Sequence, residues 1–150
     1  MSEFTIDLEW LRGDAPFVNR EYAKEHSVRF AGGQQIRNSA AADYGGDAAA
    51  ANPEELLLAA LSSCHMLTFL AVCSVRGHIV ERYVDRASCT LGKNADGKMA
   101  ITEATLSPEV SFSANPPDAA QLEQLHVRAH ANCFIAQSLR TKVHVAGLNH

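Results

Sequence analysis

The four cysteines are the side chains of this sequence best suited to nucleophilic or redox chemistry, and their spacing separates them. Cys64 stands beside His65 in SSCH, and Cys133 follows a histidine by three residues in HANC. Cys73 lies nine residues after Cys64, and on a helix that spacing turns a side chain by roughly 180°. Cys73 therefore cannot be the redox partner of Cys64, and we expect Cys73 and Cys89 to be small core residues. Cys64 and Cys133 remain as candidates for chemistry.

The segment 52–77 is predicted to be one long helix that carries Cys64 near its middle. Asn52 is a favoured N-cap, a proline follows it at the first helical position, and Gly77 supplies the stop. Residues between Leu56 and Val75 include no Asp, Glu, Lys or Arg, so we expect this helix to be buried nearly all round. The run is also long enough to span a membrane, but interrupting polar residues favour the core of a globular protein.

A reactive thiol needs a stabilised thiolate, and its own helix cannot supply one to Cys64. The dipole effect at a helix N-terminus fades within the first turn, whereas Cys64 lies roughly 16 Å along the axis. We expect a buried arginine, held in place by a carboxylate, to provide the stabilising charge. The side chains that could form such a pair are Arg20, Arg37, Glu54 and Glu55.

A metal site is the first alternative use of the two cysteines. Its ligands would be Cys64, His65, His130 and Cys133. Adjacent helical residues diverge by about 100°, so Cys64 and His65 do not converge on one ion. The sequence also contains no CxxC or HExxH motif. We therefore expect no structural metal.

Length and charge exclude several classes of partner. The chain has 150 residues, with 13 basic and 17 acidic side chains and a net charge of -4, which fits a single domain spanning residues 1–150. Its basic residues are scattered, so we expect no nucleic-acid partner and no membrane partner. The opening MSEFTIDLEW has neither the charged nor the apolar region of a secretory signal. A cytoplasmic location is expected, where the cysteines are reduced at rest.

The residues before the long helix predict a small antiparallel meander. Residues 3–11 alternate like a half-buried strand, a second strand ends at Phe30, and Gly32 with Gly33 marks a tight hairpin. The stretch 38–51 is rich in Ala, Gly and Asp and is interpreted as an exposed connector. A flap over the helix is the alternative.

Two strand-like segments follow the helix, 78–91 and 98–112, and form a second hairpin through the turn at Gly97. Pro108 marks a break, bulge or edge within the later segment, because proline cannot donate to a strand ladder.

A shorter helix begins after Asp118, a good N-cap, and Cys133 falls on its apolar face if the helix continues that far. Val143 and Val145 indicate a closing strand. The predicted class is α+β, with an antiparallel sheet of about six strands wrapped around the long buried helix. Because a helix apolar on every side needs more cover than this sheet gives, we expect a homodimer that packs two central helices together.

Two motifs resemble one known family. NPEELLLAALSSCH, followed much later by AHANCFIAQSL, is similar to the osmotically inducible protein C and organic hydroperoxide resistance proteins, the OsmC/Ohr family. The resemblance covers nearly the whole chain and implies the OsmC-like fold with an intertwined dimer. It gives Cys64 the role of peroxidatic thiol, Cys133 that of resolving thiol, and Glu54 that of orienting an activating arginine. The arginine matches Arg20 better than Arg37.

The resemblance also implies a reaction that requires no metal and no organic cofactor. The Cys64 thiolate would attack an organic hydroperoxide, and the resulting sulfenic acid would form a disulfide with Cys133 that an external dithiol reduces. Met66, Phe69 and Phe134 could form an apolar substrate pocket, or could simply be core residues.

Two other classes of function stay open. One is a hydrolase or acyl-transfer enzyme in which a histidine activates Cys64, and the other is a non-catalytic ligand-binding dimer. The roles of His65 and His130 are open as well. Glu54 precedes Cys64 by ten residues, about 15 Å of helix, so direct contact within one helix is excluded and Glu54 is expected to act through the arginine or across the dimer.

Overall fold

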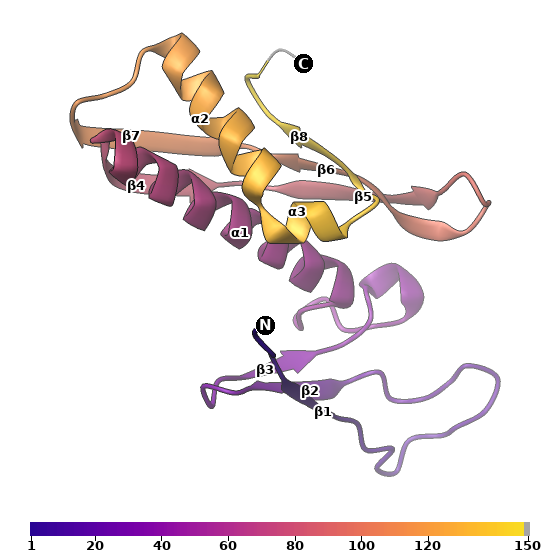
Figure 1. Ribbon diagram of the computed structural model, residues 1–150. Coiled ribbons are helices and arrows are strands. Elements are labelled where there is room, and N and C mark those ends of the chain that lie inside the picture. Colours follow the sequence, from indigo (N-terminus) through magenta and orange to yellow (C-terminus); the bar gives the residue numbers. More distant parts are fainter. Residues whose placement is uncertain (149–150) are drawn as a thin grey trace. The chain divides into compact units, whose positions relative to one another are not determined.

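The computed structural model describes residues 1–148. The chain folds as two compact units, Met1–Leu56 and a second unit that begins at Leu57. Figure 1 shows the succession of elements along the chain.

The first unit is built on a three-stranded antiparallel sheet of β1 (Ile6–Glu9), β2 (His26–Phe30) and β3 (Gln35–Asn38), in the order β1-β2-β3. The N–H of Phe30 donates to Gln34, and that of Gly33 donates to Phe30, at 2.8 and 2.9 Å. Gly33 has φ of 88°, a conformation that glycine adopts without steric cost. The meander and its glycine hairpin are thus confirmed.

The stretch after β3 is a folded connector with a short 3-10 helix, η1 (Ala42–Tyr44). The N–H of Ser39 donates to Ala51 at 2.8 Å, and that of Asp47 donates to the Ser39 hydroxyl at 3.1 Å. These hydrogen bonds join the start of the connector to its middle and its end. Gly46 lies so near Ala40 that a Cβ atom there would overlap the Ala40 carbonyl group.

The long helix α1 (Pro53–Arg76) begins and ends where the sequence predicts. The Glu55 N–H donates to the Asn52 side chain at 2.9 Å, and the Asn52 N–H donates to the Glu55 carboxylate at 3.2 Å, which is a reciprocal capping box. At the other end Gly77 has φ of 77°, and the His78 N–H returns to the Cys73 carbonyl at 3.0 Å.

Within one chain α1 is buried along a single stripe rather than on every side. Its buried residues are Leu61, His65, Phe69 and Cys73, whereas Leu67 is 59% and Val75 87% exposed. The expectation of burial all round is wrong for the single chain, because the strands and α2 cover one face only. By length and composition α1 is also the one helix in residues 1–148 that could cross a membrane, but its buried stripe packs in the protein core.

The segments after α1 form a long antiparallel ribbon that is broken once on each strand. Its strands are β4 (Ile79–Asp85), β5 (Ser88–Lys93), β6 (Met99–Leu106) and β7 (Pro108–Ala114), with β4 paired to β7 and β5 to β6. The break before Pro108 was predicted. The break after Asp85 was not, because it contains neither proline nor glycine. Counting each long segment as one strand gave six strands, whereas residues 1–148 contain eight.

Asp85 holds the two breaks together. Its carboxylate accepts the Ser107 N–H at 2.7 Å and the Ser62 hydroxyl of α1 at 2.5 Å. The closing strand, β8 (Lys142–Val145), pairs with β6 in parallel.

Helix α2 (Ala119–Asn132) begins at Asp118 with a capping box, as predicted. It ends one residue before Cys133, and a short helix, α3 (Phe134–Ser138), starts directly after that residue. Cys133 therefore lies at the junction of two helices, not on the second helix as expected. The α+β class itself is confirmed, whereas the sheet, predicted to be antiparallel throughout, includes the parallel pair of β6 and β8.

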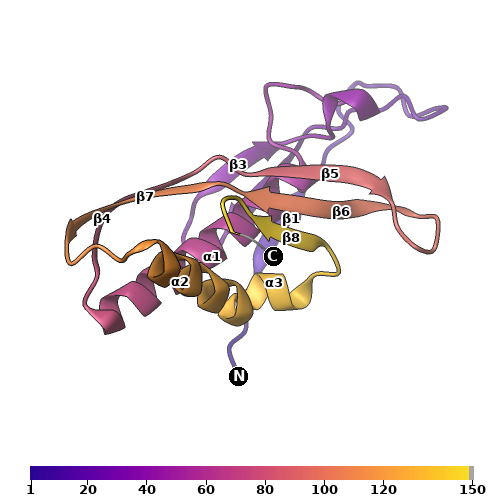
Figure 2. The same cartoon turned by 90° about the horizontal axis from the view of Figure 1, so that it is seen from above.

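Two hydrophobic clusters form the core of the second unit, in which α1 and α2 lie on one face of the strand ribbon (Figure 2). The first cluster joins the N-terminal half of α1 to β6, β8 and Cys133, and its fully buried members include Leu61 and Leu106. The second joins the C-terminal half of α1 to α2, β4 and β7 around Phe69 and Leu125.

The connector provides a test of its packing. We expect Gly46→Ala to lower the free energy of unfolding by about 1–3 kcal/mol, because the added Cβ would overlap backbone that cannot move aside. Urea unfolding measures the change. Gly92→Ala is the matched control, since its Cβ would meet only the Thr102 side chain, with Oγ1 at 3.4 Å and Cγ2 at 3.8 Å. Equal stability of the two variants would contradict the tight packing of Gly46 against Ala40.

Candidate functional site

The structure brings Cys64 and Cys133 together in the first hydrophobic cluster. Cys64 lies on α1 and is half-buried, Cys133 is fully buried at the α2–α3 junction, and both are free thiols. The Cys133 thiol donates a hydrogen bond to the Cys64 sulfur. The two sulfur atoms are therefore neighbours that could be joined in a disulfide.

Neutral hydrogen-bond donors lower the pKa of Cys64. Burial alone would raise the pKa of Cys64, but hydrogen bonds from the Cys133 thiol, the Ile135 and Phe134 N–H groups and the Thr68 hydroxyl together lower it below its usual value. The Thr68 hydroxyl also lies 2.9 Å from the Cys64 carbonyl oxygen, to which it donates. It can turn to the thiolate only by giving up that bond, so the thiol and the two amides are the firmer donors.

The two amides belong to the first turn of α3, and sequence reasoning missed them. It searched only the helix on which Cys64 lies, whose N-terminus is too far away. The signal for α3 was the stretch FIAQS directly after Cys133. Because Cys133 is the N-cap of α3, the residue that donates its thiol to Cys64 also sets the direction of the amides.

Burial, together with its hydrogen bond to Cys64, raises the pKa of Cys133 to about 11. The Ala136 N–H donates to Cys133 Sγ at 3.4 Å, which opposes the rise. At neutral pH Cys64 is thus the more acidic thiol and Cys133 remains protonated, as a nucleophile and its resolving partner require.

The other two cysteines lie apart from this pair. Cys73 is buried in the second cluster beside Phe69, and burial raises its pKa. Cys89, on β5, packs against the first cluster from the side of the sheet. The prediction that Cys73 is a core residue is confirmed.

Two histidines, His65 on α1 and His126 on α2, are buried on the helices that lead to the two thiols. His65 Nε2 and His126 Nδ1 are 3.0 Å apart, and one of them donates to the other. Burial, with smaller repulsion between neighbouring imidazoles, lowers the pKa of each to about 4. Sequence reasoning saw His65 but missed His126, although its spacing of four from His130 places both on one side of α2. Residues 1–148 contain no group of three or more Cys, His, Asp or Glu side chains arranged to hold a metal ion.

Arg20 lies at the tip of a tight turn in the first unit. Val18 and Glu21 exchange both backbone hydrogen bonds, at 3.2 and 2.7 Å, and the two residues between them, Asn19 and Arg20, have φ of 49° and 69°. Positive φ is costly for a residue with a long side chain. Within residues 1–148 no carboxylate is paired with Arg20, and the residue lines a cavity with Trp10 and other aromatic side chains.

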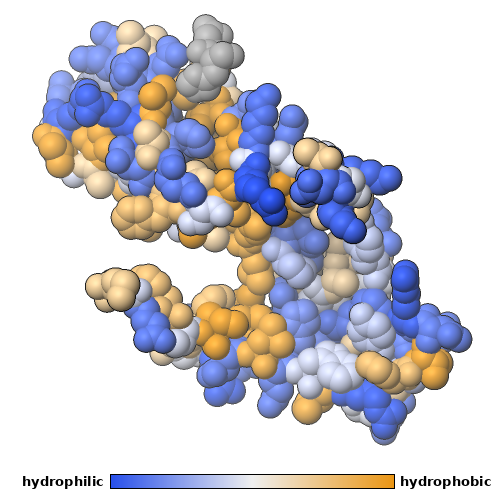
Figure 3. All heavy atoms as spheres, turned by 45° about the vertical axis from the view of Figure 1, so that its right-hand side comes forward, coloured by the Kyte–Doolittle hydropathy of each residue, from blue (hydrophilic) through white to orange (hydrophobic). Residues whose placement is uncertain are grey.

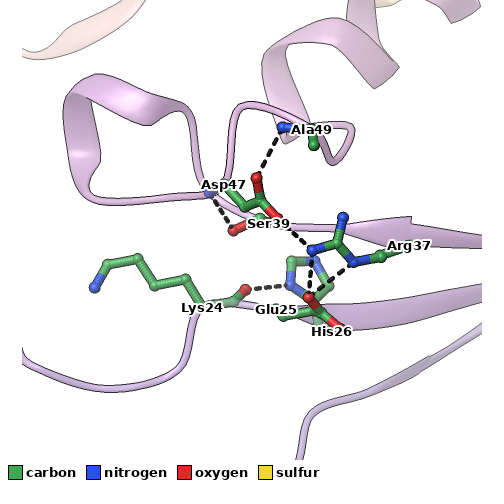
Figure 4. A network of polar contacts seen from close by, with 7 residues as sticks. All are labelled: Lys24, Glu25, His26, Arg37, Ser39, Asp47 and Ala49. Carbon is green, nitrogen blue, oxygen red and sulfur yellow. Dashed lines mark hydrogen bonds and ion pairs between the residues drawn. The ribbon is translucent and has the colours of Figure 1, made fainter.

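Arg37 is already engaged in ion pairs. Its Nε donates to Glu25 at 2.8 Å, and its Nη2 is paired with Asp47 (Figure 4). The Ala49 N–H holds the other oxygen of Asp47 at 2.8 Å. Hydrogen bonds to Glu25 and Asp47 raise the pKa of Arg37 above its usual value. Arg37 therefore links β3 to the connector, and its guanidinium is already paired with two carboxylates there.

Glu54, in the first turn of α1, has one oxygen that is unsatisfied. Its Oε2 is buried and has no hydrogen-bond partner among residues 1–148. A buried carboxylate oxygen without a donor is unfavourable. Glu55 is the capping residue, so of the two glutamates Glu54 is the one free to orient a cation.

Two of the side chains considered for an apolar pocket have very different surroundings. Phe69 is fully buried and stacks on His126 with 4.3 Å between ring centroids, so it is a core residue. Phe134 is 83% exposed.

Comparisons with known proteins agree with this architecture. Residues 45–146 match the family model described as OsmC-like protein. An OsmC-like protein of unknown function from Vibrio cholerae is 41% identical, with 97% of this chain and 98% of that chain covered and a TM-score of 0.93. No curated protein matches the sequence.

Two organic hydroperoxide resistance proteins share the fold at lower identity. The protein from Bacillus subtilis is 20% identical with a TM-score of 0.61, covering 95% of each chain. The protein from Elizabethkingia anophelis is 18% identical with a TM-score of 0.69, covering 96% of this chain and 94% of that chain. The family model and the Vibrio cholerae relative together show that this chain belongs to the OsmC-like family.

Proposed function

We propose that this protein is a thiol peroxidase that reduces organic hydroperoxides to alcohols through Cys64 and Cys133. The observation that carries the proposal is the hydrogen-bonded pair of thiols with unequal acidity, one lowered and one raised in pKa. Family membership and the names of the organic hydroperoxide resistance proteins that share the fold support it.

The proposed reaction balances with two thiols and one peroxide. The Cys64 thiolate attacks the terminal peroxide oxygen, the O–O bond breaks, and the alkoxide takes up a proton to become the alcohol. Cys64 is left as a sulfenic acid, which condenses with Cys133 to give a disulfide and water. An external dithiol then reduces that disulfide by thiol exchange. Such reductants are abundant in the cytoplasm, where we propose that the protein works.

A histidine-activated hydrolase receives no support from the geometry. Within residues 1–148 none of the hydrogen bonds joins an imidazole to Cys64, although such a mechanism needs the base in contact with its nucleophile.

Peroxide treatment tests the reaction. One equivalent of cumene hydroperoxide should convert the reduced protein to a Cys64–Cys133 disulfide, detected by peptide mapping, with release of cumyl alcohol. Cys64→Ser should abolish peroxide consumption, whereas Cys133→Ser should stop at the sulfenic acid. Cys73→Ser is the control and should behave as the parent protein. A dominant disulfide from Cys64 to Cys73 or Cys89 would refute the assignment.

We assign the activating arginine to Arg20 and its orienting carboxylate to Glu54, following the family resemblance. Three observations support the choice: Arg37 is held by two carboxylates, Arg20 is paired with none in residues 1–148, and the buried Glu54 Oε2 has no donor there. The strained backbone of Arg20 also favours a functional role over a structural one.

Replacement of the two arginines separates their roles. We expect Arg20→Ala to slow peroxide attack by roughly tenfold or more, because a positive charge near the developing alkoxide is lost, and to raise the pKa of Cys64. Stopped-flow kinetics and thiolate absorbance against pH measure the two effects. Arg37→Ala is the comparison and should affect mainly stability. If Arg37→Ala slowed peroxide attack and raised the pKa of Cys64 while Arg20→Ala did neither, the activating role would belong to Arg37.

We further propose that the working unit is a homodimer. In the first unit Val28 is the one buried apolar side chain, while Ile6 and Leu8 of the same sheet are more than half exposed. A three-stranded sheet needs such a face covered to be stable. Exposed apolar side chains also occur on α1, and Figure 3 shows apolar residues at the surface of the molecule.

Mixed dimers test whether Glu54 acts across the interface. A Cys64→Ser chain combined with a Glu54→Ala chain should regain one intact site per mixed dimer, giving about a quarter of the parental activity after statistical mixing of a two-fold dimer. No recovery would place Glu54 in the same chain as its cysteine. An active monomer in sedimentation would refute the dimer.

A further inference from the structure

Phe134 is an apolar side chain beside the two thiols that neither the core nor the proposed reaction uses. It is the first residue of α3, a short helix that turns away from α2 directly after Cys133 (Figure 1), and it is 83% exposed. By contrast, Leu61 and Ile135 pack in the first cluster. A single exposed apolar side chain is ordinary at a protein surface, so the position of Phe134 relative to Cys64 decides whether it has a role.

The backbone of Phe134 contacts the Cys64 sulfur. Its N–H is one of the donors that lower the pKa of Cys64. The nitrogen and the Cβ atom of one residue are bonded to the same Cα and lie only about 2.5 Å apart, so the Phe134 side chain begins beside the thiol. Of the three residues from this junction that donate to Cys64, Cys133 is fully buried, Ile135 is half-buried and Phe134 is exposed. Phe134 is therefore the one whose side chain a molecule arriving from outside would contact.

The two helices around Cys64 offer no charge to such a molecule. Between Leu56 and Val75 α1 has no Asp, Glu, Lys or Arg, and α3 has the uncharged sequence FIAQS. A charged group close to the reacting atom of a ligand would gain no ion pair from either helix. An apolar group would instead leave water against the ring of Phe134. The surroundings of Cys64 within the second unit therefore favour an apolar group.

We propose that Phe134 is a specificity-determining residue, whose ring contacts the organic group of the molecule that the Cys64 thiolate attacks. The inference rests on the proposed peroxidase function and adds to it a residue that selects the substrate. In an organic hydroperoxide the organic group is bonded to the oxygen next to the one attacked, so it lies within reach of a ring beside the sulfur. Hydrogen peroxide has no such group. The backbone N–H of Phe134 thus contributes to the acidity of Cys64, and its side chain distinguishes substrates.

Truncation of the ring tests the proposal. We expect Phe134→Ala to lower kcat/KM for cumene hydroperoxide about tenfold, because one apolar contact in a site is worth a factor of this size. The value for hydrogen peroxide should stay within about twofold of the parent. The pKa of Cys64 should not change, because the donor is a backbone group. Phe134→Leu keeps an apolar side chain and should restore most of the loss.

A proline at the same position separates the backbone role from that of the side chain. Proline is favoured at the first position of a helix, and Cys133 has φ of -73° and ψ of 112°, which suits a residue before proline. Phe134→Pro lacks both the N–H and the aromatic ring. It should raise the pKa of Cys64, measured by thiolate absorbance against pH, whereas Phe134→Ala should not.

Val75→Ala is the matched control, because Val75 is 87% exposed on α1 but lies eleven residues beyond Cys64, about 16 Å along the helix. It should change neither peroxide reaction. Equal effects of Phe134→Ala on cumene hydroperoxide and hydrogen peroxide, or no effect on either, would overturn the proposal. A shift of Phe134→Ala to monomer in sedimentation, with both reactions slowed alike, would show an interface role instead and would also overturn it.

Two disulfide-forming reagents test Phe134 without any peroxide. With benzyl or methyl methanethiosulfonate, the Cys64 thiolate attacks the sulfur that carries the organic group, a new S–S bond forms, and methanesulfinate leaves. Phe134→Ala should slow the benzyl reagent at least about fivefold and leave the methyl reagent unchanged, with peptide mapping to confirm reaction at Cys64. A parent protein that consumes no peroxide would refute the peroxidase function, while the ratio of the two reagent rates would still decide the role of Phe134.

Discussion

The contact of the Cys133 thiol with the Cys64 sulfur is the interaction on which the candidate site depends. It requires α1 and the end of α2 to meet at one point of the first hydrophobic cluster. Because Cys133 also ends α2 and caps α3, the same residue directs the Phe134 and Ile135 amides toward Cys64. A continuous helix through Cys133 would remove those two amide donors from the site, so the break in the helix helps to set the pKa of Cys64.

A polar layer on α1, made of His65 and Ser62 with their partners on other elements, imposes a second constraint on that helix. A helix with a wholly apolar buried stripe could slide along its neighbours by one turn at little cost, whereas His65 has one specific partner on α2 and Ser62 has one on β4. Displacement by a turn would strand both side chains in the core, where unpaired polar groups are unfavourable. The layer therefore fixes the register in which Cys64 faces Cys133.

Features determined by local chemistry were predictable from the sequence. The cap at Asn52, the stop at Gly77 and the hairpin at Gly33 each depend on residues within a few positions of one another. The break after Asp85 was not predictable, because bonds to Ser62 and Ser107, distant in sequence, hold it. The α2–α3 junction was missed for a related reason: the apolar spacing continues to Cys133 although the helix does not.

The difference between local and long-range interactions also decides what could be predicted of the candidate site. Helical spacing was sufficient to set Cys73 aside and to direct attention to Cys64 and Cys133. It could not show which groups stabilise the thiolate, since those donors come from an element more than sixty residues away in the sequence. Neutral donors already lower the Cys64 pKa, so thiolate formation does not depend on an arginine alone. Neutral donors cannot match the full charge that develops on an alkoxide leaving group, whereas a guanidinium can. The arginine proposed from the family resemblance should therefore matter more for the attack on peroxide than for the acidity of the thiol.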